Sequence, residues 1–153
     1  MNSLKLFGAA AWALSACLFS TVSFAQEQRV QMKDLPPAVQ KTVQEHSKDG
    51  KVRGLSKELN QGKTVYEAEL LIQGKSKDML IAEDGAIIEV EEQVALNALP
   101  AAVQAALRKA AGRGRITLVE AVTKNGALAF YEAHVNTRGK VTEVKVSPDG
   151  QPL

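Results

Sequence analysis

Two pairs of residues in this chain have the types and the spacing of metal ligands. Glu132 and His134 are two positions apart, as are Glu67 and Glu69 earlier in the chain. Residues two apart on a β-strand point to the same side, so each pair presents two ligand groups together. Zinc takes three or four protein ligands, so one pair is not sufficient. A metal site is therefore expected only if the fold brings all four side chains together; otherwise they form a solvated sheet face.

The residue set gives no support to nucleophilic catalysis. A Ser or Cys nucleophile needs a neighbouring base that a third group orients. The chain has one cysteine, Cys17, and two histidines, His46 and His134, which fall in different halves of the sequence. We therefore expect a protein that is not an enzyme and that holds no cofactor.

Residues 1–25 are typical of a secretory signal peptide. Lys5 precedes an apolar run over residues 6–22, and Ser23-Phe24-Ala25 supplies the small residues of a cleavage site. Cleavage there predicts a periplasmic or secreted protein with no transmembrane anchor. Cys17 ends a lipobox-like Leu-Ser-Ala-Cys sequence, so the alternative is a protein anchored by a lipid on this cysteine.

Prolines and glycines mark the expected helix and strands of the first half. Residues 26–33 are polar and are expected to be a flexible lead-in. A helix is expected to begin near Asp34, which could cap it, with prolines in its first turn. Four strand-like segments follow, separated by glycine turns at positions 62, 74 and 85. Short apolar runs joined by such turns predict a four-stranded antiparallel meander.

The second half repeats this order. Leu35-Pro36 returns as Leu99-Pro100, and glycines at 126, 139 and 150 follow at nearly the same spacing. The expected fold is therefore an α+β tandem repeat of a helix and a four-stranded meander, with units at residues 34–94 and 95–153. The second unit ends at Pro152-Leu153, so its last strand is expected to be truncated.

The strand residues indicate which face of each sheet is buried. Tyr66, Ala68 and Leu70 alternate with Glu67 and Glu69, which predicts an apolar face under the helix and a polar face on the other side. The first unit also has apolar residues on both sides of its strands. Its polar face is therefore expected to be partly covered, by the second unit or by a partner.

The sequence resembles the PepSY-like proteins, which are described as β-lactamase-inhibitor-like. The similarity lies in the Leu-Pro helix starts, in Tyr66-Glu67-Ala68-Glu69-Leu70 and its counterpart Tyr131-Glu132-Ala133-His134-Val135, and in the closing segment 143–150. The resemblance implies small exported α+β modules without enzymatic activity, often in bacterial envelopes. It transfers no binding residues, because the shared positions are structural.

Charge and motifs together favour a binding protein. A formal net charge of +2 is too small to indicate a nucleic-acid partner. The first half is net acidic and the second net basic, and such asymmetry can steer partners. The leading hypothesis is an exported non-enzymatic module that recognises or modulates a protein or peptide in the bacterial envelope, through a sheet face or an edge strand. The alternative is an envelope sensor or carrier of a small ligand or cation.

Overall fold

The computed structural model describes residues 27–153. The expected signal peptide and the alternative lipidation site at Cys17 lie outside the described residues. Among residues 27–153, no helix is both long enough and apolar enough to cross a membrane.

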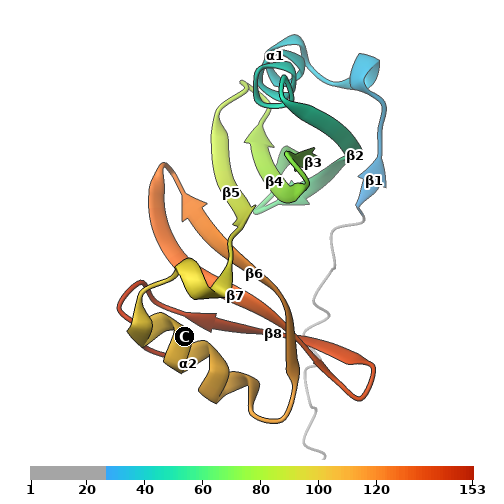
Figure 1. Cartoon of the computed structure of the whole chain (residues 1–153). Helices are drawn as coiled ribbons and strands as arrows, with labels where there is room; N and C mark the ends of the chain where they lie inside the picture. The colour runs from blue at the N-terminus through green and yellow to red at the C-terminus, as the bar shows by residue number, and fades with distance from the viewer. Residues whose placement is uncertain (1–26) are drawn as a thin grey trace, which may run out of the picture.

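The described chain forms one eight-stranded antiparallel sheet with the strands in sequence order (Figure 1). The strands are β1 Gln28–Arg29, β2 Gly50–Asn60, β3 Lys63–Ile72, β4 Lys75–Ala82, β5 Ile87–Gln93, β6 Arg115–Lys124, β7 Ala127–Thr137 and β8 Lys140–Val146. The helices are α1 Pro37–His46 and α2 Ala101–Ala111, each preceded by a short 3₁₀ helix, η1 Met32–Asp34 and η2 Leu96–Ala98. Short hairpins join β2 to β5 and β6 to β8 in order, whereas α1 lies between β1 and β2 and α2 lies between β5 and β6.

The expected fold of two tandem helix-plus-four-strand units is wrong. β5 pairs with β6 from Glu89↔Lys124 to Gln93↔Glu120, so the sheet continues through the middle of the chain. Only three strands follow α2, and the C-terminal residues add one bridge, Val146↔Pro152. A separate first unit would leave the backbone donors and acceptors of β5 unpaired at an edge, and pairing with β6 satisfies them.

Two local expectations also differ from the structure. Gln28 and Arg29, placed in a flexible lead-in, form β1 and pair with Lys57 and Ser56 of β2. Asp34 does not cap α1: the N-cap position is Pro36, and Asp34 accepts a hydrogen bond from the backbone N–H of Gln31 instead. A proline restricts the residue before it to extended conformations, so Pro36 keeps Leu35 extended and Pro37 keeps Pro36 extended. The helix therefore begins at Pro37.

Each helix lies over its own apolar cluster. In α1, Val39 and Val43 are fully buried and pack with Leu70, Met79 and Ile81 of β3 and β4. The corresponding cluster under α2 contains Leu99, Val103, Leu107, Val119, Ala133 and Val146. Burial of these apolar stripes supplies the main stabilisation of two short helices that would be marginal alone.

The register places both helices on the same face of the sheet. Met79, in the cluster under α1, is opposite Val90 of β5, and Glu92 on that same side is opposite Ala121 of β6. Ala121 is in turn opposite Tyr131, which packs against the cluster under α2. Residues opposite one another on paired strands share a face. The α1 face and the α2 face are therefore one face.

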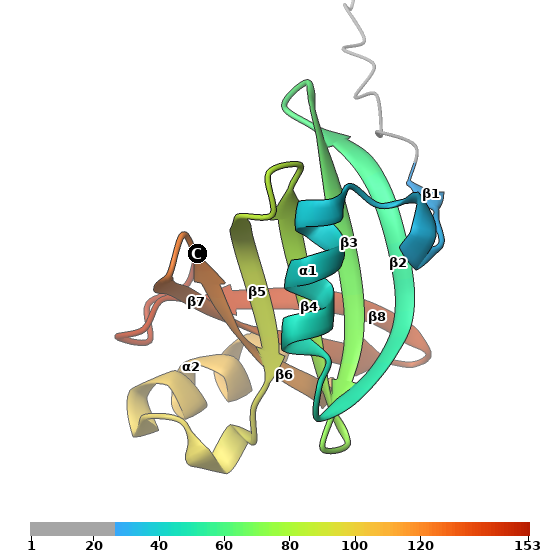
Figure 2. The ribbon, with the colours of Figure 1, turned by 90° about the horizontal axis from the view of Figure 1, so that it is seen from above.

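The sheet is strongly curved between the helices. α1 and α2 lie at opposite ends of the molecule with the sheet between them (Figure 1), and β8 runs across the direction of β2–β5 (Figure 2). Since both helices occupy the same face, that face is convex, and the helix-free face is on the inside of the curve. We call the second surface the concave face.

Candidate functional site

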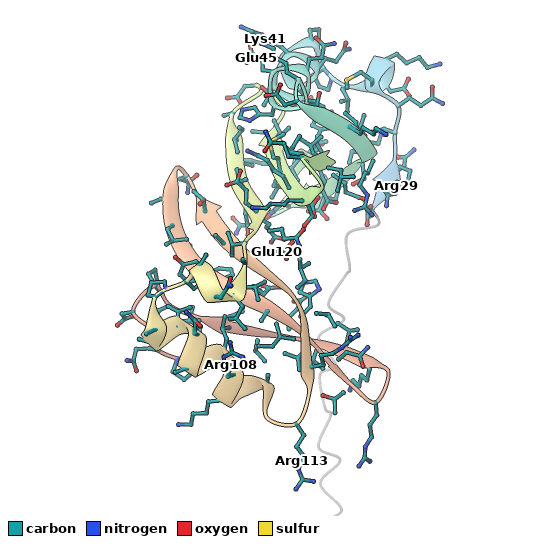
Figure 3. All side chains as sticks on the ribbon, viewed as in Figure 1. Arg29, Lys41, Glu45, Arg108, Arg113 and Glu120 are labelled. Atoms are coloured by element: carbon teal, nitrogen blue, oxygen red, sulfur yellow. The ribbon has the colours of Figure 1, made fainter. Side chains whose placement is uncertain are left out.

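The concave face carries most of the carboxylates that the strands contribute. Side chains alternate along each strand, so every second residue of a strand belongs to it. Figure 3 places Glu120 between the two halves, away from the basic residues Arg108 and Arg113 of the α2 region. The carboxylates of the concave face are Glu58, Glu67, Glu69, Asp78, Glu89, Glu91, Glu120, Glu132 and Glu143.

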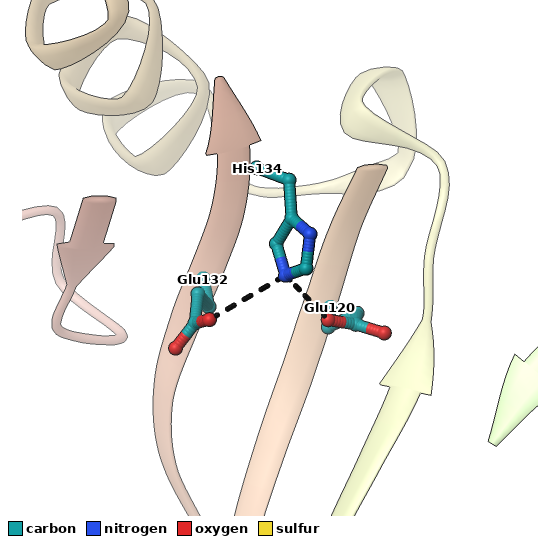
Figure 4. A group of neighbouring side chains, drawn as sticks. All are labelled: Glu120, Glu132 and His134. Carbon is teal, nitrogen blue, oxygen red and sulfur yellow. Dashed lines mark ion pairs between the residues drawn. The ribbon is translucent and has the colours of Figure 1, made fainter. Parts of the chain in front are cut away.

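His134 lies between two buried carboxylates (Figure 4). Its Nε2 is 3.5 Å from Glu120 Oε2 and 3.6 Å from Glu132 Oε1. Glu120 is 3% exposed and Glu132 4% exposed, although both are acidic. A buried carboxylate needs a partner. Lys145 supplies one for Glu132, at 2.8 Å, and the Ser76 hydroxyl donates to Glu120 at 3.4 Å.

A second cluster, of three carboxylates, joins the two halves of the sheet. Asp78 of β4, Glu91 of β5 and Glu120 of β6 each offer an oxygen within 4.8 Å of the others. Burial, with the neighbouring charges of Glu120 and Glu132, raises the pKa of Glu91 to about 7. Burial also raises the pKa of Asp78 and of Glu120. Like charges so close together cannot all ionise without cost, so this group favours a bound proton or a cation.

The four residues proposed from the sequence as metal ligands do not form one group. Glu132 and His134 lie together, as their spacing predicts. Glu67 accepts a hydrogen bond from the Ser56 hydroxyl at 3.2 Å, and Glu69 pairs with Arg29 at 2.6 Å. Four strand spacings of about 4.8 Å separate β3 from β7, or roughly 19 Å along the sheet. Glu67 and Glu69 share the concave face with Glu132 and His134 but lie on a different part of it.

The structure offers Glu120, Glu132 and His134 as the residues most suited to a cation. Their ligand atoms lie within 4.8 Å of one another. Two carboxylates and one imidazole suit zinc or another divalent ion that accepts mixed oxygen and nitrogen ligands. Lys145 already neutralises Glu132, so a metal ion would compete with this lysine.

Sequence reasoning missed Asp78 and Glu120, the two residues that connect the groups. Both stand at polar positions of an alternating strand: Asp78 precedes Met79, and Glu120 lies between Val119 and Ala121. That alternation predicts their face, as it does for Glu67. It does not predict their proximity, which depends on the pairing of β5 with β6.

An aromatic ring and two lysines lie on the concave face beside the acidic groups. The Nζ atoms of Lys124 and Lys145 are 5.4 and 5.0 Å from the centre of the Phe130 ring. Both distances suit cation–π contacts. Lys124 also pairs with Glu89 at 3.1 Å. The concave face thus changes from acidic on β3–β5 to a mixture of acidic, basic and aromatic side chains on β6–β8.

Comparisons with known proteins identify solved structures with the same fold but assign the chain to no family. No protein-family model matches the chain, and no curated protein matches its sequence. Solved structures do match. A Bacteroides eggerthii protein described as periplasmic has a TM-score of 0.62 at 17% identity, over 78% of this chain and 86% of that chain.

Two further structures share the fold. A DUF2874 family protein from Bacteroides ovatus has a TM-score of 0.58 at 20% identity, over 78% of this chain and 84% of its own. A BLIP-like protein from Bacteroides fragilis has a TM-score of 0.54 at 18% identity, over 76% and 81%.

These likenesses refine the expectations from the sequence. They agree with the β-lactamase-inhibitor-like part of the resemblance and do not support the PepSY assignment. The periplasmic location expected from the N-terminal segment agrees with the description of the Bacteroides eggerthii protein.

Proposed function

We propose that this chain is an exported, non-enzymatic module that binds a partner protein with the concave face of its sheet. The observation that carries the proposal is the position of the helices. Both lie on the convex face, so within residues 27–153 no helix covers the concave face. The described part of the chain has its fold in common with a BLIP-like protein and with a periplasmic protein, which supports an exported, protein-binding role.

The composition of the concave face supports this role. Phe130 is partly exposed there, beside Lys124 and Lys145. Aromatic residues are enriched in protein interfaces, and interfaces combine an apolar centre with polar surroundings. The absence of a nucleophile with a base and an orienting group in the sequence supports a non-enzymatic role.

Site-specific photocrosslinking in the periplasm tests the proposal. Phe130 is replaced by benzoylphenylalanine, which keeps the aromatic ring on the concave face. The control carries the same residue at Lys41, which is exposed on α1. A protein adduct from position 130 and not from position 41 is the expected result. Adducts from position 41 alone, or from neither position, would contradict a concave-face partner.

The second candidate function is a sensor or carrier of a cation, favoured by the cluster of Glu120, Glu132 and His134. Thermal unfolding of the wild type with added Zn²⁺ or Ca²⁺ tests it, with His134→Ala as the matched variant. A rise in melting temperature that His134→Ala removes would favour this function. No rise with either ion would exclude it.

A further inference from the structure

A hollow in the concave face is lined by acidic residues and by no basic ones. It measures about 290 Å³ and lies over β2–β5. Carboxylates dominate its lining, and the residues that matter here are Glu58, Glu67, Asp78, Leu80, Glu89 and Glu91. None of the residues that line it is a lysine, an arginine or a histidine.

Several carboxylates of the concave face are neutralised by lysine or arginine side chains of the chain itself. Glu69 pairs with Arg29, Glu89 with Lys124 and Glu132 with Lys145, at 2.6, 3.1 and 2.8 Å. Of these three carboxylates, Glu89 lines the hollow, and Glu69 and Glu132 lie outside its lining. Three of the nine carboxylates of this face thus have a lysine or arginine partner.

Three other carboxylates of the hollow have no such counter-charge in the described chain. Within residues 27–153, no cationic group forms an ion pair with Glu67, Asp78 or Glu91. Arg53 acts on Asp78 only at longer range. The three side chains are partly buried, which weakens their solvation and strengthens their mutual repulsion. An incoming positive charge would remove a repulsion that the isolated protein retains.

The hollow also has an apolar side. Leu80 lies opposite Glu67 on β3 and opposite Glu89 on β5, so it lies between the carboxylates. Lysine and arginine combine an aliphatic stem with a charged head, and an arginine head can donate to two carboxylates at once. A bare metal ion would make no use of Leu80.

We propose that the concave face binds a basic segment of its partner protein, with an arginine or lysine side chain entering the hollow between Glu67, Asp78 and Glu91. The proposal rests on the function proposed above and specifies the chemistry of the partner. The aliphatic stem packs on Leu80, and the charged head takes the place of the missing cation. Charge complementarity gives such a complex its association rate and its specificity.

The test uses the chain with benzoylphenylalanine at position 130, in three charge backgrounds. The first is otherwise wild type, the second carries Asp78→Asn with Glu91→Gln, and the matched control carries Glu45→Gln on the exposed side of α1. Loss of two partly buried charge contacts is expected to lower the crosslinking yield about tenfold. The Glu45→Gln background is expected to leave the yield unchanged, and the partner peptide attached should contain lysine or arginine.

The outcomes separate the two proposals. Equal yields in all three backgrounds would overturn the proposed recognition of a basic segment. They would leave the proposed binding of a partner to the concave face intact. No adduct in any background would contradict the proposed function itself. Melting temperatures check that the double variant is folded, and Glu91→Gln alone serves as a milder second variant.

A defined probe gives an independent readout. A short synthetic peptide of alternating glycine and arginine is titrated into ¹⁵N-labelled protein, with a glycine–glutamate peptide as control. Shifts at the backbone amides of β3–β5, weaker at high salt, are expected for the arginine peptide alone. Shifts with both peptides or with neither, or shifts that Ca²⁺ alone reproduces, would contradict recognition of a basic side chain.

Discussion

At the scale of single residues, the acidic groups of the concave face set the chemistry of this protein. Glu120 and Glu132 are almost completely buried, and each has a specific partner on another strand: Ser76 for Glu120 and Lys145 for Glu132. Glu91 has no such cationic partner among the described residues. These differences predict opposite effects when individual charges are removed.

Neutralising Glu91 should stabilise the protein at neutral pH. Its pKa is raised from 4.5 to about 7 in the folded state, so the folded protein binds more protons than the unfolded chain between these values. Wild-type stability therefore falls as the pH rises from about 5 to 8. Allowing for solvent screening, we expect Glu91 to lower the free energy of unfolding by about 1 kcal/mol over this pH range. Thermal melts across this range should show a flatter pH profile for Glu91→Gln, and Glu45→Gln should retain the wild-type slope.

Removing Lys145 should have the opposite effect. Lys145→Ala leaves the buried Glu132 carboxylate beside Glu120 and His134, without its lysine partner. Because the lysine is itself partly exposed, we expect a loss of about 1–2 kcal/mol in the free energy of unfolding. Urea denaturation measures it. The double variant Lys145→Ala with Glu132→Gln should recover most of the loss, and failure to recover would mean that the lysine acts through packing on Phe130.

At the scale of the elements, the two helices are held by close contacts with glycine turns. Gly85 follows β4 with φ = 86°, and a Cβ atom there would lie 2.9 Å from the backbone oxygen of Ala38 in α1. Gly150 makes the same contact with Ala102 in α2, also at 2.9 Å. Each turn thus positions a helix over the sheet, in addition to connecting or ending strands.

Alanine at position 85 should cost more than alanine at a free turn. Gly62 has a similar φ of 79°, but nothing lies within 4 Å of its added Cβ. Gly62→Ala is expected to cost about 1 kcal/mol, from the left-handed conformation alone. Gly85→Ala must also displace α1, so we expect it to lower the free energy of unfolding by about 2–4 kcal/mol in total. Denaturant unfolding of both variants measures the difference, and equal losses would contradict the close contact.

At the scale of the whole molecule, the pairing of β5 with β6 is the decisive feature. It turns two sets of strands into one curved sheet, and it brings Asp78 and Glu91 of the first set to Glu120 of the second. Without this pairing, the concave face would be two separate surfaces.

Hydrogen exchange should detect the continuous sheet. The backbone N–H groups of Val94 and Asn125 donate to Val119 and Ile88 at the two ends of the β5–β6 pairing, each at 2.9 Å. These amides and those between them in β5 should exchange as slowly as those of central strands β3 and β4. Rapid exchange along the β6-facing edge of β5, with slow exchange in β3, would indicate two independent units.

Much of the local structure could be predicted from the sequence. Period-two alternation correctly places Glu67 and Glu69 on the face opposite Tyr66 and Ala68, and Gly62 lies in a two-residue hairpin turn as expected. The expected cap of α1 at Asp34 is wrong, because Leu35 and Pro36 each precede a proline and are extended, so the helix begins at Pro37. Such local features depend on neighbouring residues, so a single sequence carries them.

The larger arrangement was decided by tertiary structure. Strands pair through backbone N–H and C=O groups that every residue except proline possesses, so nothing in the side chains of β5 marks β6 as its partner. The sequence by itself determined the strands, their turns and the side of each strand on which its carboxylates lie. Only the β5–β6 pairing and the curvature of the sheet brought Asp78, Glu91 and Glu120 together. Burial and like charge at that meeting point raise the pKa of Glu91 to about 7.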